Sequence, residues 1–161
     1  MPQSNAFKFA NNILTNGGYD AADLVGAVGG GKVLQVITAT DSTQRSLTST
    51  SFITTSNTLS VSITPSSASN KIFVIASTCM ISGSGATIFA TIFRGATNLG
   101  TSNGISQASG FAWDSTSLSI LDSPSTTSAT TYQVYYRVDG GTAYINGDGT
   151  KTSITAFEIA A

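Results

Sequence analysis

The segment from Thr58 to Thr64 constrains the fold most. Leu59, Val61 and Ile63 alternate along it with Thr and Ser side chains. This is the period-2 pattern of a strand with one face on a core and the other in water. No segment beyond residue 26 has a helical period. We therefore expect a fold built from sheets.

Charged residues are scarce. The chain has 7 Lys/Arg and 8 Asp/Glu among 161 residues, about 9%, against a typical quarter. Because charge repulsion keeps most globular proteins apart, so few charges favour a chain that works inside an assembly. Alternatively, the abundant Ser and Thr simply cover exposed strand faces, where Thr is favoured. The two interpretations are compatible.

The same composition excludes several classes of partner. A net charge of −1 without a basic cluster argues against nucleic acid, since backbone binding needs several Lys/Arg on one face. No 18-residue apolar run and no signal-peptide pattern occurs, so we expect neither membrane insertion nor secretion, and synthesis in a cytoplasm. The single cysteine, Cys79, lies in an apolar run and is predicted to be a buried thiol.

Catalytic patterns are weak. The lack of histidine removes the commonest general base and metal ligand. Glycoside hydrolysis needs two carboxylates at a fixed separation, and Asp114 and Asp122 are the only pair worth considering. The spacing of Gly26–Lys32 fits a phosphate loop, but Val33 stands where Ser or Thr should bind magnesium. Asn146–Gly149 is only a fragment of a calcium loop. We expect no enzyme, no cofactor and no metal.

Residues 1–31 differ from the rest and are predicted to form an N-terminal arm. Ser4 is a candidate cap for a short helix, and a glycine-rich hinge closes the segment at Gly26–Gly31. The arm is too small to bury its own apolar side chains, so we expect it to dock on another surface; folding back on its own domain is the alternative. The docking residues are Phe7, Phe9, Ile13, Leu14, Tyr19, Leu24 and Val25.

Residues 32–161 are predicted to form a β-sandwich. Short strands alternate with turn signals every eight to twelve residues, as in sandwiches and barrels. The predicted strands are Lys32–Thr38, Thr50–Thr54, Thr58–Thr64, Lys71–Met80, Thr87–Arg94, Ser109–Asp114, Ser117–Leu121, Thr131–Val138, Thr142–Asn146 and Thr152–Ile159.

Turn chemistry divides these strands. Asp139–Gly141 predicts a tight hairpin, and Asn146–Gly149 predicts a second hairpin turn. Gly95–Ser109 is the least regular connection, and loops of that size usually carry a role or stay mobile.

Several strands carry apolar side chains on both faces, although a sandwich sheet has one core face. A second copy of the chain is the simplest cover for the other face; a role in an ordinary core is the alternative. We expect the subunit contact to include Phe89, Tyr135, Tyr144 and Phe157. Trp113 has the chemistry to stack on a sugar ring, although a core role is commoner. With Asn103 and Asp148 it forms the set of candidate receptor-facing residues.

Seven segments of the chain resemble the small domains repeated in tail-fibre and virion-surface proteins of tailed phages, notably phages of aquatic bacteria. The resemblance covers residues 31–161. Its segments are Gly31–Ile37, Ser49–Phe52, Leu59–Ser67, Asn70–Val74, Phe93–Asn98, Leu121–Tyr132 and Thr152–Ile159.

The resemblance implies a jelly-roll sandwich of the tumour-necrosis-factor kind, assembled as a homotrimer on a virion. It implies a short tail fibre or tail-attached host-recognition protein anchored by the arm. A capsid decoration (cement) protein is the first alternative, and a carbohydrate-binding lectin is the second. The implied partners are further copies of the chain, another virion protein (tail hub, adaptor or major capsid protein), and a host surface glycan or protein. The family offers no catalytic residues.

Overall fold

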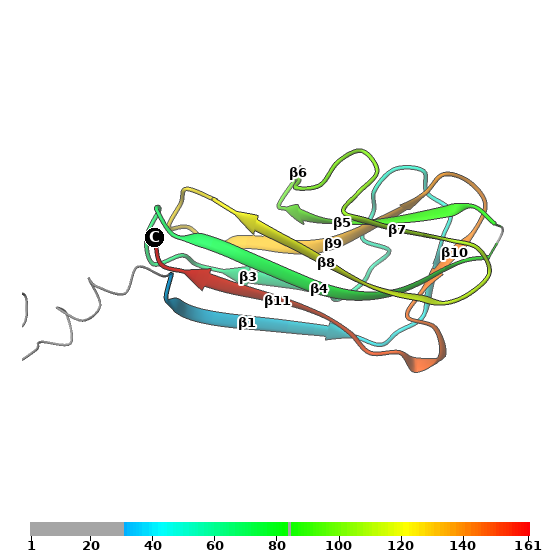
Figure 1. The fold of residues 1–161 in the computed structure, drawn as a ribbon, viewed down its shortest axis with the longest axis horizontal. Helices are drawn as coiled ribbons and strands as arrows, with labels where there is room; N and C mark the ends of the chain where they lie inside the picture. Colours follow the sequence, from blue (N-terminus) through cyan, green and yellow to red (C-terminus); the bar gives the residue numbers. More distant parts are fainter. Residues whose placement is uncertain (1–30, 84) are drawn as a thin grey trace, which may run out of the picture. The chain divides into compact units, whose positions relative to one another are not determined.

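Two antiparallel sheets make up the fold (Figure 1). The computed structural model describes residues 31–83 and 85–161, apart from the side chain of residue 148. Sheet A contains β1 (Val33–Asp41), β11 (Thr152–Ile159), β4 (Lys71–Ser82), β8 (Asp114–Asp122), β10 (Ala143–Ile145) and β2 (Arg45–Leu47). Sheet B contains β3 (Ser60–Ile63), β9 (Thr130–Val138), β5 (Thr87–Arg94), β6 (Thr97–Asn98) and β7 (Ser106–Ser109).

The strand order defines a jelly roll. In sheet A the long strands lie in the order β1-β11-β4-β8, and in sheet B the order is β3-β9-β5-β7. Among these eight strands the chain passes from one sheet to the other at every step except from β5 to β7, which is the double Greek-key arrangement of jelly rolls. The predicted all-β jelly-roll sandwich is therefore confirmed.

The core lies between the two sheets and follows the alternation that the sequence displays. Along β9 every second side chain, from Tyr132 to Val138, is buried, and along β11 Ile154 and Ala156 face them. Because the strands alternate so cleanly, the core takes one face of each sheet and leaves the other face outside. In the described part of the chain, no helix is long and apolar enough to cross a membrane.

Most predicted strands are confirmed, and two are confirmed to the residue: Thr87–Arg94 and Thr152–Ile159. The predicted strand Ser109–Asp114 is wrong. Gly110 has φ +95° there, because the chain turns from β7 in sheet B to β8 in sheet A. The predicted strand Thr50–Thr54 is reduced to a single bridge between Ile53 and the edge of β9.

Both predicted hairpins are also wrong. Asp139–Gly141 carries the chain from β9 in sheet B to β10 in sheet A, so no hairpin forms. Asn146–Gly149 lies between β10 and β11, which pair with the same edge of β4 in the same direction. The segment is therefore a bulge in one interrupted strand, with a 3₁₀ turn at Gly147–Gly149. Turn residues indicate where a chain bends but not which strand it meets next.

One turn beside β9 is strained. Thr55 and Ser56 have φ +53° and +58°, and the Asn57 amide donates to the Thr54 carbonyl at 3.0 Å. Two successive positive φ values define a type I′ turn, for which Asn-Gly is preferred.

Replacing Thr55 with Asn and Ser56 with Gly is expected to raise the free energy of unfolding by about 1 kcal/mol, because non-glycine residues in this region are strained. Urea denaturation measures the change. Ser51→Gly is the control, since Ser51 is exposed and has no positive φ; it should lower stability slightly. Equal effects of the two changes would refute the strain argument.

Candidate functional site

A row of apolar side chains crosses the outer face of sheet A. Val36, Phe157, Phe73 and Leu121 stand at the same register on β1, β11, β4 and β8. The two phenyl rings lie 6.1 Å apart, and Val36 and Leu121 are each 53% exposed. We call these four residues the apolar row.

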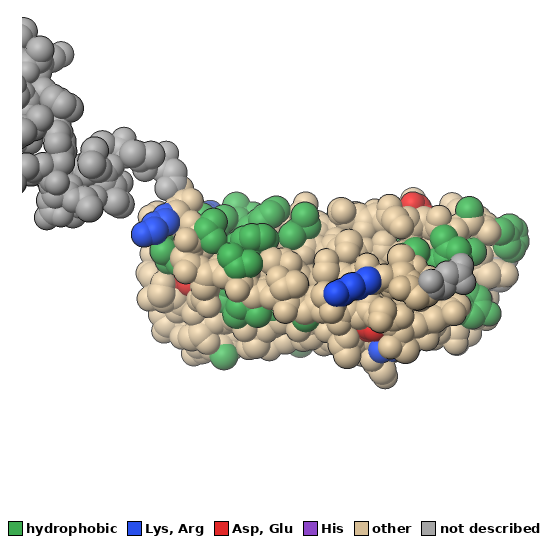
Figure 2. All heavy atoms as spheres, turned by 90° about the horizontal axis from the view of Figure 1, so that it is seen from below, with side chains coloured by type: hydrophobic (Ala, Val, Ile, Leu, Met, Phe, Trp, Pro, Cys, Tyr) green, Lys and Arg blue, Asp and Glu red, His purple; other side chains and the backbone are tan. Residues whose placement is uncertain are grey.

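The apolar row is part of a wider hydrophobic area. Val33, Leu34 and Ile75, which lie close to it in the strands, are also exposed, and Figure 2 shows hydrophobic side chains gathered toward the end of the sandwich where β1 begins. A sheet face turned to water is normally polar, whereas large contiguous apolar areas are typical of interaction surfaces.

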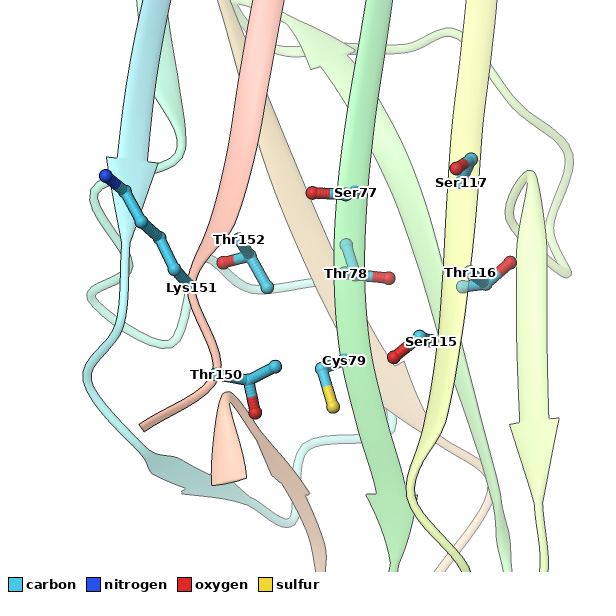
Figure 3. Close-up of a pocket in the computed structure, with 9 residues that line it drawn as sticks. All are labelled: Ser77, Thr78, Cys79, Ser115, Thr116, Ser117, Thr150, Lys151 and Thr152. Carbon is cyan, nitrogen blue, oxygen red and sulfur yellow. The ribbon is translucent and has the colours of Figure 1, made fainter. Parts of the chain in front are cut away.

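Farther along the same face lies a hollow of about 140 Å³. Its lining comes from the bulge before β11, from the middle of β4 and from the start of β8 (Figure 3). Ser77, Ser115 and Ser117 supply hydroxyls, and Lys151 is the charged residue of the lining. Cys79 also lines the hollow and is 5% exposed, so the predicted burial of this thiol is confirmed. This lining offers hydrogen bonds but no carboxylate.

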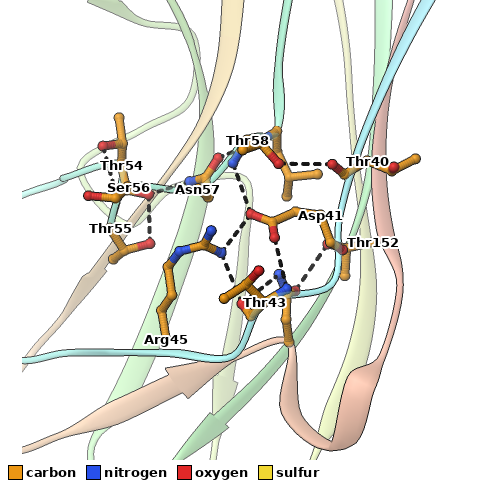
Figure 4. Close-up of polar contacts among 12 residues, drawn as sticks. Thr40, Asp41, Thr43, Arg45, Thr54, Thr55, Ser56, Asn57, Thr58 and Thr152 are labelled. Carbon is orange, nitrogen blue, oxygen red and sulfur yellow. Dashed lines mark hydrogen bonds and ion pairs between the residues drawn. The ribbon is translucent and has the colours of Figure 1, made fainter.

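A buried carboxylate closes the end of the sandwich at which β1 ends (Figure 4). The Asp41 side chain is 2% exposed and forms an ion pair with Arg45 at 2.6 Å. It also accepts hydrogen bonds from the backbone amides of Thr43 and Thr58 at 2.9 and 2.8 Å. Burial by itself raises the pKa of Asp41, but these hydrogen bonds and the Arg45 charge outweigh it and hold the pKa below its ordinary value. The carboxylate therefore stays ionised and fastens the loops that follow β1.

The outer face of sheet B carries an aromatic cluster. Tyr135 stacks on Phe93 with ring centroids 4.0 Å apart, and Phe52 meets Phe93 edge-on at 6.1 Å. The guanidinium carbon of Arg137 lies 3.9 Å from the centroid of Phe89 and 5.4 Å from that of Phe52. Phe89 is consequently only 7% exposed within the single chain.

The structure does not bring the four predicted subunit-contact residues together. Phe89 and Tyr135 lie on the outer face of sheet B, whereas Phe157 lies in the apolar row of sheet A. Tyr144 lies on β10 in sheet A, with its ring beside Gly83. The predicted docking arm, from Phe7 to Val25, is outside the described residues.

The candidate receptor-facing residues are also apart. Trp113 is half-buried, and its ring packs so closely on Gly147 that a Cβ there would lie 1.8 Å from it. Asn103 is exposed and accepts a hydrogen bond from Arg137 at 3.1 Å. The side chain of Asp148 is outside the described residues.

The two carboxylates considered for hydrolysis stand at opposite ends of β8. A nine-residue strand spans roughly 26 Å, far beyond the separation of about 10 Å or less in glycosidases. Asp122 is already bound to Arg94 at 2.9 Å and to the Tyr132 hydroxyl at 2.7 Å. In the described ranges, no group of three metal-binding side chains occurs.

Sequence reasoning missed Phe73, Leu121 and Arg137 as surface residues of interest. Phe73 and Leu121 belong to predicted strands, but their alignment depends on the pairing of β4 with β8. The one sequence feature that could have indicated Arg137 is its position as a charged residue within an aromatic-rich strand. Its contacts come from segments that lie up to 85 residues away in the chain, as with Phe52.

Comparisons with known proteins add little to this description. No protein-family model matches the sequence, and no curated protein is similar to it. Among solved structures, the chain is similar to the VP2 subviral particle of infectious bursal disease virus, with a TM-score of 0.40 and 13% identity. The match covers 79% of this chain and 38% of that one. The strand order by itself places the chain among jelly-roll β-sandwiches.

Proposed function

We propose that the chain is a structural, noncatalytic protein of a virus particle, assembled as a homotrimer through the outer face of sheet A. In this proposal it is a short tail fibre or a tail-attached host-recognition protein, held to the particle by residues 1–31. The exposed apolar row carries the proposal. The resemblance of residues 31–161 to tail-fibre and virion-surface domains supports the setting.

The physical argument is the cost of leaving the apolar row in water. Full burial of an exposed large apolar side chain stabilises a protein or an interface by about 1.5–3 kcal/mol. The row presents two such side chains, Val36 and Leu121, each 53% exposed, with the half-buried rings of Phe157 and Phe73 between them. The hydroxyls of Thr38 and Thr155 lie beside it and are already paired with each other at 3.0 Å. Few charged groups would have to be desolvated on association, which favours contact between copies.

Phe73→Asp is expected to abolish the trimer, because it places a charge in the centre of the apolar row. Analytical ultracentrifugation of the full chain should give three times 16.4 kDa for the wild type and the monomer mass for the variant. Thr131→Asp is the matched control: Thr131 is exposed on β9 in sheet B, so the trimer should persist. A wild-type chain that stays monomeric at high concentration would overturn the proposal.

The location of the protein on the particle is tested separately, by the number and position of its copies on the intact virion. A few trimers on the tail are expected; hundreds of copies that follow capsid symmetry would indicate decoration of the shell instead. Removal of residues 1–25 should abolish association with the particle while the trimer survives. Unchanged particle association after this deletion would rule out the arm as the anchor.

A further inference from the structure

Arg137 is held rigidly on the outer face of sheet B. Its guanidinium stacks on Phe89 at 3.9 Å, and its Nε and Nη2 atoms donate to the Ser102 carbonyl at 3.1 and 2.9 Å. Nη2 also donates to the Asn103 side-chain oxygen at 3.1 Å. Four contacts thus fix the plane of a side chain that is usually mobile, so little conformational entropy would be lost on binding a ligand.

The charge of Arg137 is not neutralised within the described chain. Arg45 and Arg94 each form an ion pair with an aspartate, at 2.6 and 2.9 Å. Arg137 has no such pair among the described residues, and its Nη1 atom makes no hydrogen bond to any of them. A positioned guanidinium with two free N–H groups is suited to a carboxylate, because hydrogen bonds between charged partners are the stronger kind.

Half-buried aromatic rings lie next to this charge. Phe52 lies 5.4 Å from the guanidinium, and Phe93 and Tyr135 continue the aromatic surface as a stacked pair. The face of an aromatic ring is electronegative, so it attracts the C–H groups of a pyranose ring. Neighbouring Thr101, Ser102 and Asn103 are exposed and offer polar groups for sugar hydroxyls.

We propose that Arg137, Phe52 and Asn103, with the buried Phe89 ring supporting the guanidinium from beneath, form a binding site for a carboxylate-bearing sugar, such as a uronate of an acidic surface glycan. We call these four residues the Arg137 site. The sugar carboxylate accepts hydrogen bonds from Arg137 Nη1, and its ring lies over the neighbouring aromatic surface. A single unpaired cation suits one carboxylate and not a nucleic-acid backbone, which needs several. This inference rests on the proposed function, to which it adds the ligand class for host attachment.

The probe is a β-1,4-linked mannuronate tetrasaccharide, with β-1,4-mannotetraose as the neutral counterpart that differs only in its carboxylates. Amide NMR shifts of the full-length chain should move near Phe52, Ser102 and Arg137 on titration with the mannuronate. Mannotetraose should bind at least about tenfold more weakly, because it lacks the charge-assisted hydrogen bond. Equal binding of the two sugars, or no binding of the mannuronate at millimolar concentration, would overturn the proposal.

Asn103→Asp tests whether the positive charge of Arg137 binds the sugar carboxylate, without disturbing the fold. The change is isosteric, at an exposed position, and puts a carboxylate where Arg137 Nη2 already donates; mannuronate affinity should fall about tenfold or more. Arg137→Gln should do the same. Lys151→Gln removes an exposed positive charge in the bulge before β11 and should leave affinity unchanged; an equal loss there would show nonspecific attraction and refute the site. Trimer mass is measured on the same samples, so failure of assembly and failure of binding are distinguishable.

Discussion

Replacing Glu158 with glutamine is expected to lower the free energy of unfolding by about 3 kcal/mol at neutral pH. Glu158, the chain's only glutamate, is 1% exposed at the C-terminal end of β11. Its Oε1 accepts hydrogen bonds from the Ser66 amide and Asn70 Nδ2, both at 2.6 Å, and its Oε2 accepts from Gln35 Nε2 at 2.6 Å. A glutamine amide would turn a donor toward other donors and leave buried groups unpaired, which costs about 1–3 kcal/mol for each group.

The same site predicts sensitivity to acid. Burial raises the pKa of Glu158, but the hydrogen bonds from Asn70, Gln35 and Ser66 outweigh it and lower the pKa from 4.5 to about 2. Because the folded pKa lies below the unfolded one, the carboxylate's contribution is complete above about pH 4.5 and is lost as pH falls toward 2. The free energy of unfolding, measured by urea denaturation, should therefore fall less between pH 7 and pH 3 for Glu158→Gln than for the wild type.

Asp114→Asn serves as the control for both measurements. Asp114 is exposed at the start of β8, so its replacement should change stability by less than about 0.5 kcal/mol. If Glu158→Gln were as mild as this control, Glu158 would not fasten the loop at Ser66 to the end of β11.

A strand can be predicted from the sequence where its own residues alternate between polar and apolar or are flanked by turn residues. β11 alternates polar and apolar residues and β5 is flanked by turn residues, so both were predicted at their observed bounds. β7 and β2 have only four and three residues, too few for a period to appear, and tertiary pairing alone makes them strands. The interrupted strand β10-β11 looked like a hairpin because Asn146–Gly149 has turn chemistry, and only the shared partner β4 reveals one continuous edge.

The candidate surfaces depend on the pairing register between neighbouring strands, and the sequence of one strand does not specify that register. Apolar side chains on both faces of several strands predict an apolar outer face, and Phe157 is one of the four residues predicted at the subunit contact. Its alignment with Val36, Phe73 and Leu121 follows from three separate strand pairings. The Arg137 site depends in the same way on a loop around residue 102 that folds against β9, and local sequence cannot indicate that contact.

Gly104→Ala is expected to lower the free energy of unfolding by about 3 kcal/mol and to loosen the Arg137 site. Gly104 has φ +75°, and a Cβ on it would lie 2.5 Å from the Ala90 carbonyl oxygen in β5. A positive φ costs a non-glycine residue about 1 kcal/mol, and overpacking against backbone costs about 1–3 kcal/mol more. The Ile105 amide donates to the same Ala90 carbonyl at 2.8 Å, so the loop cannot move aside without losing this bond.

Gly95→Ala separates the strain of a positive φ from the overpacking of an added Cβ against β5. Gly95 also has a positive φ, +54°, but an added Cβ would meet nothing within 4 Å, so this change should cost only the strain of about 1 kcal/mol. The difference between the variants in thermal or urea denaturation then measures the close approach of the loop to β5. Because Ser102 and Asn103 lie in that loop and hold Arg137, only Gly104→Ala should also weaken mannuronate binding. Equal losses of stability in the two variants would mean that the loop is not seated on β5, and the fixed guanidinium on which the Arg137 site depends would lose its support.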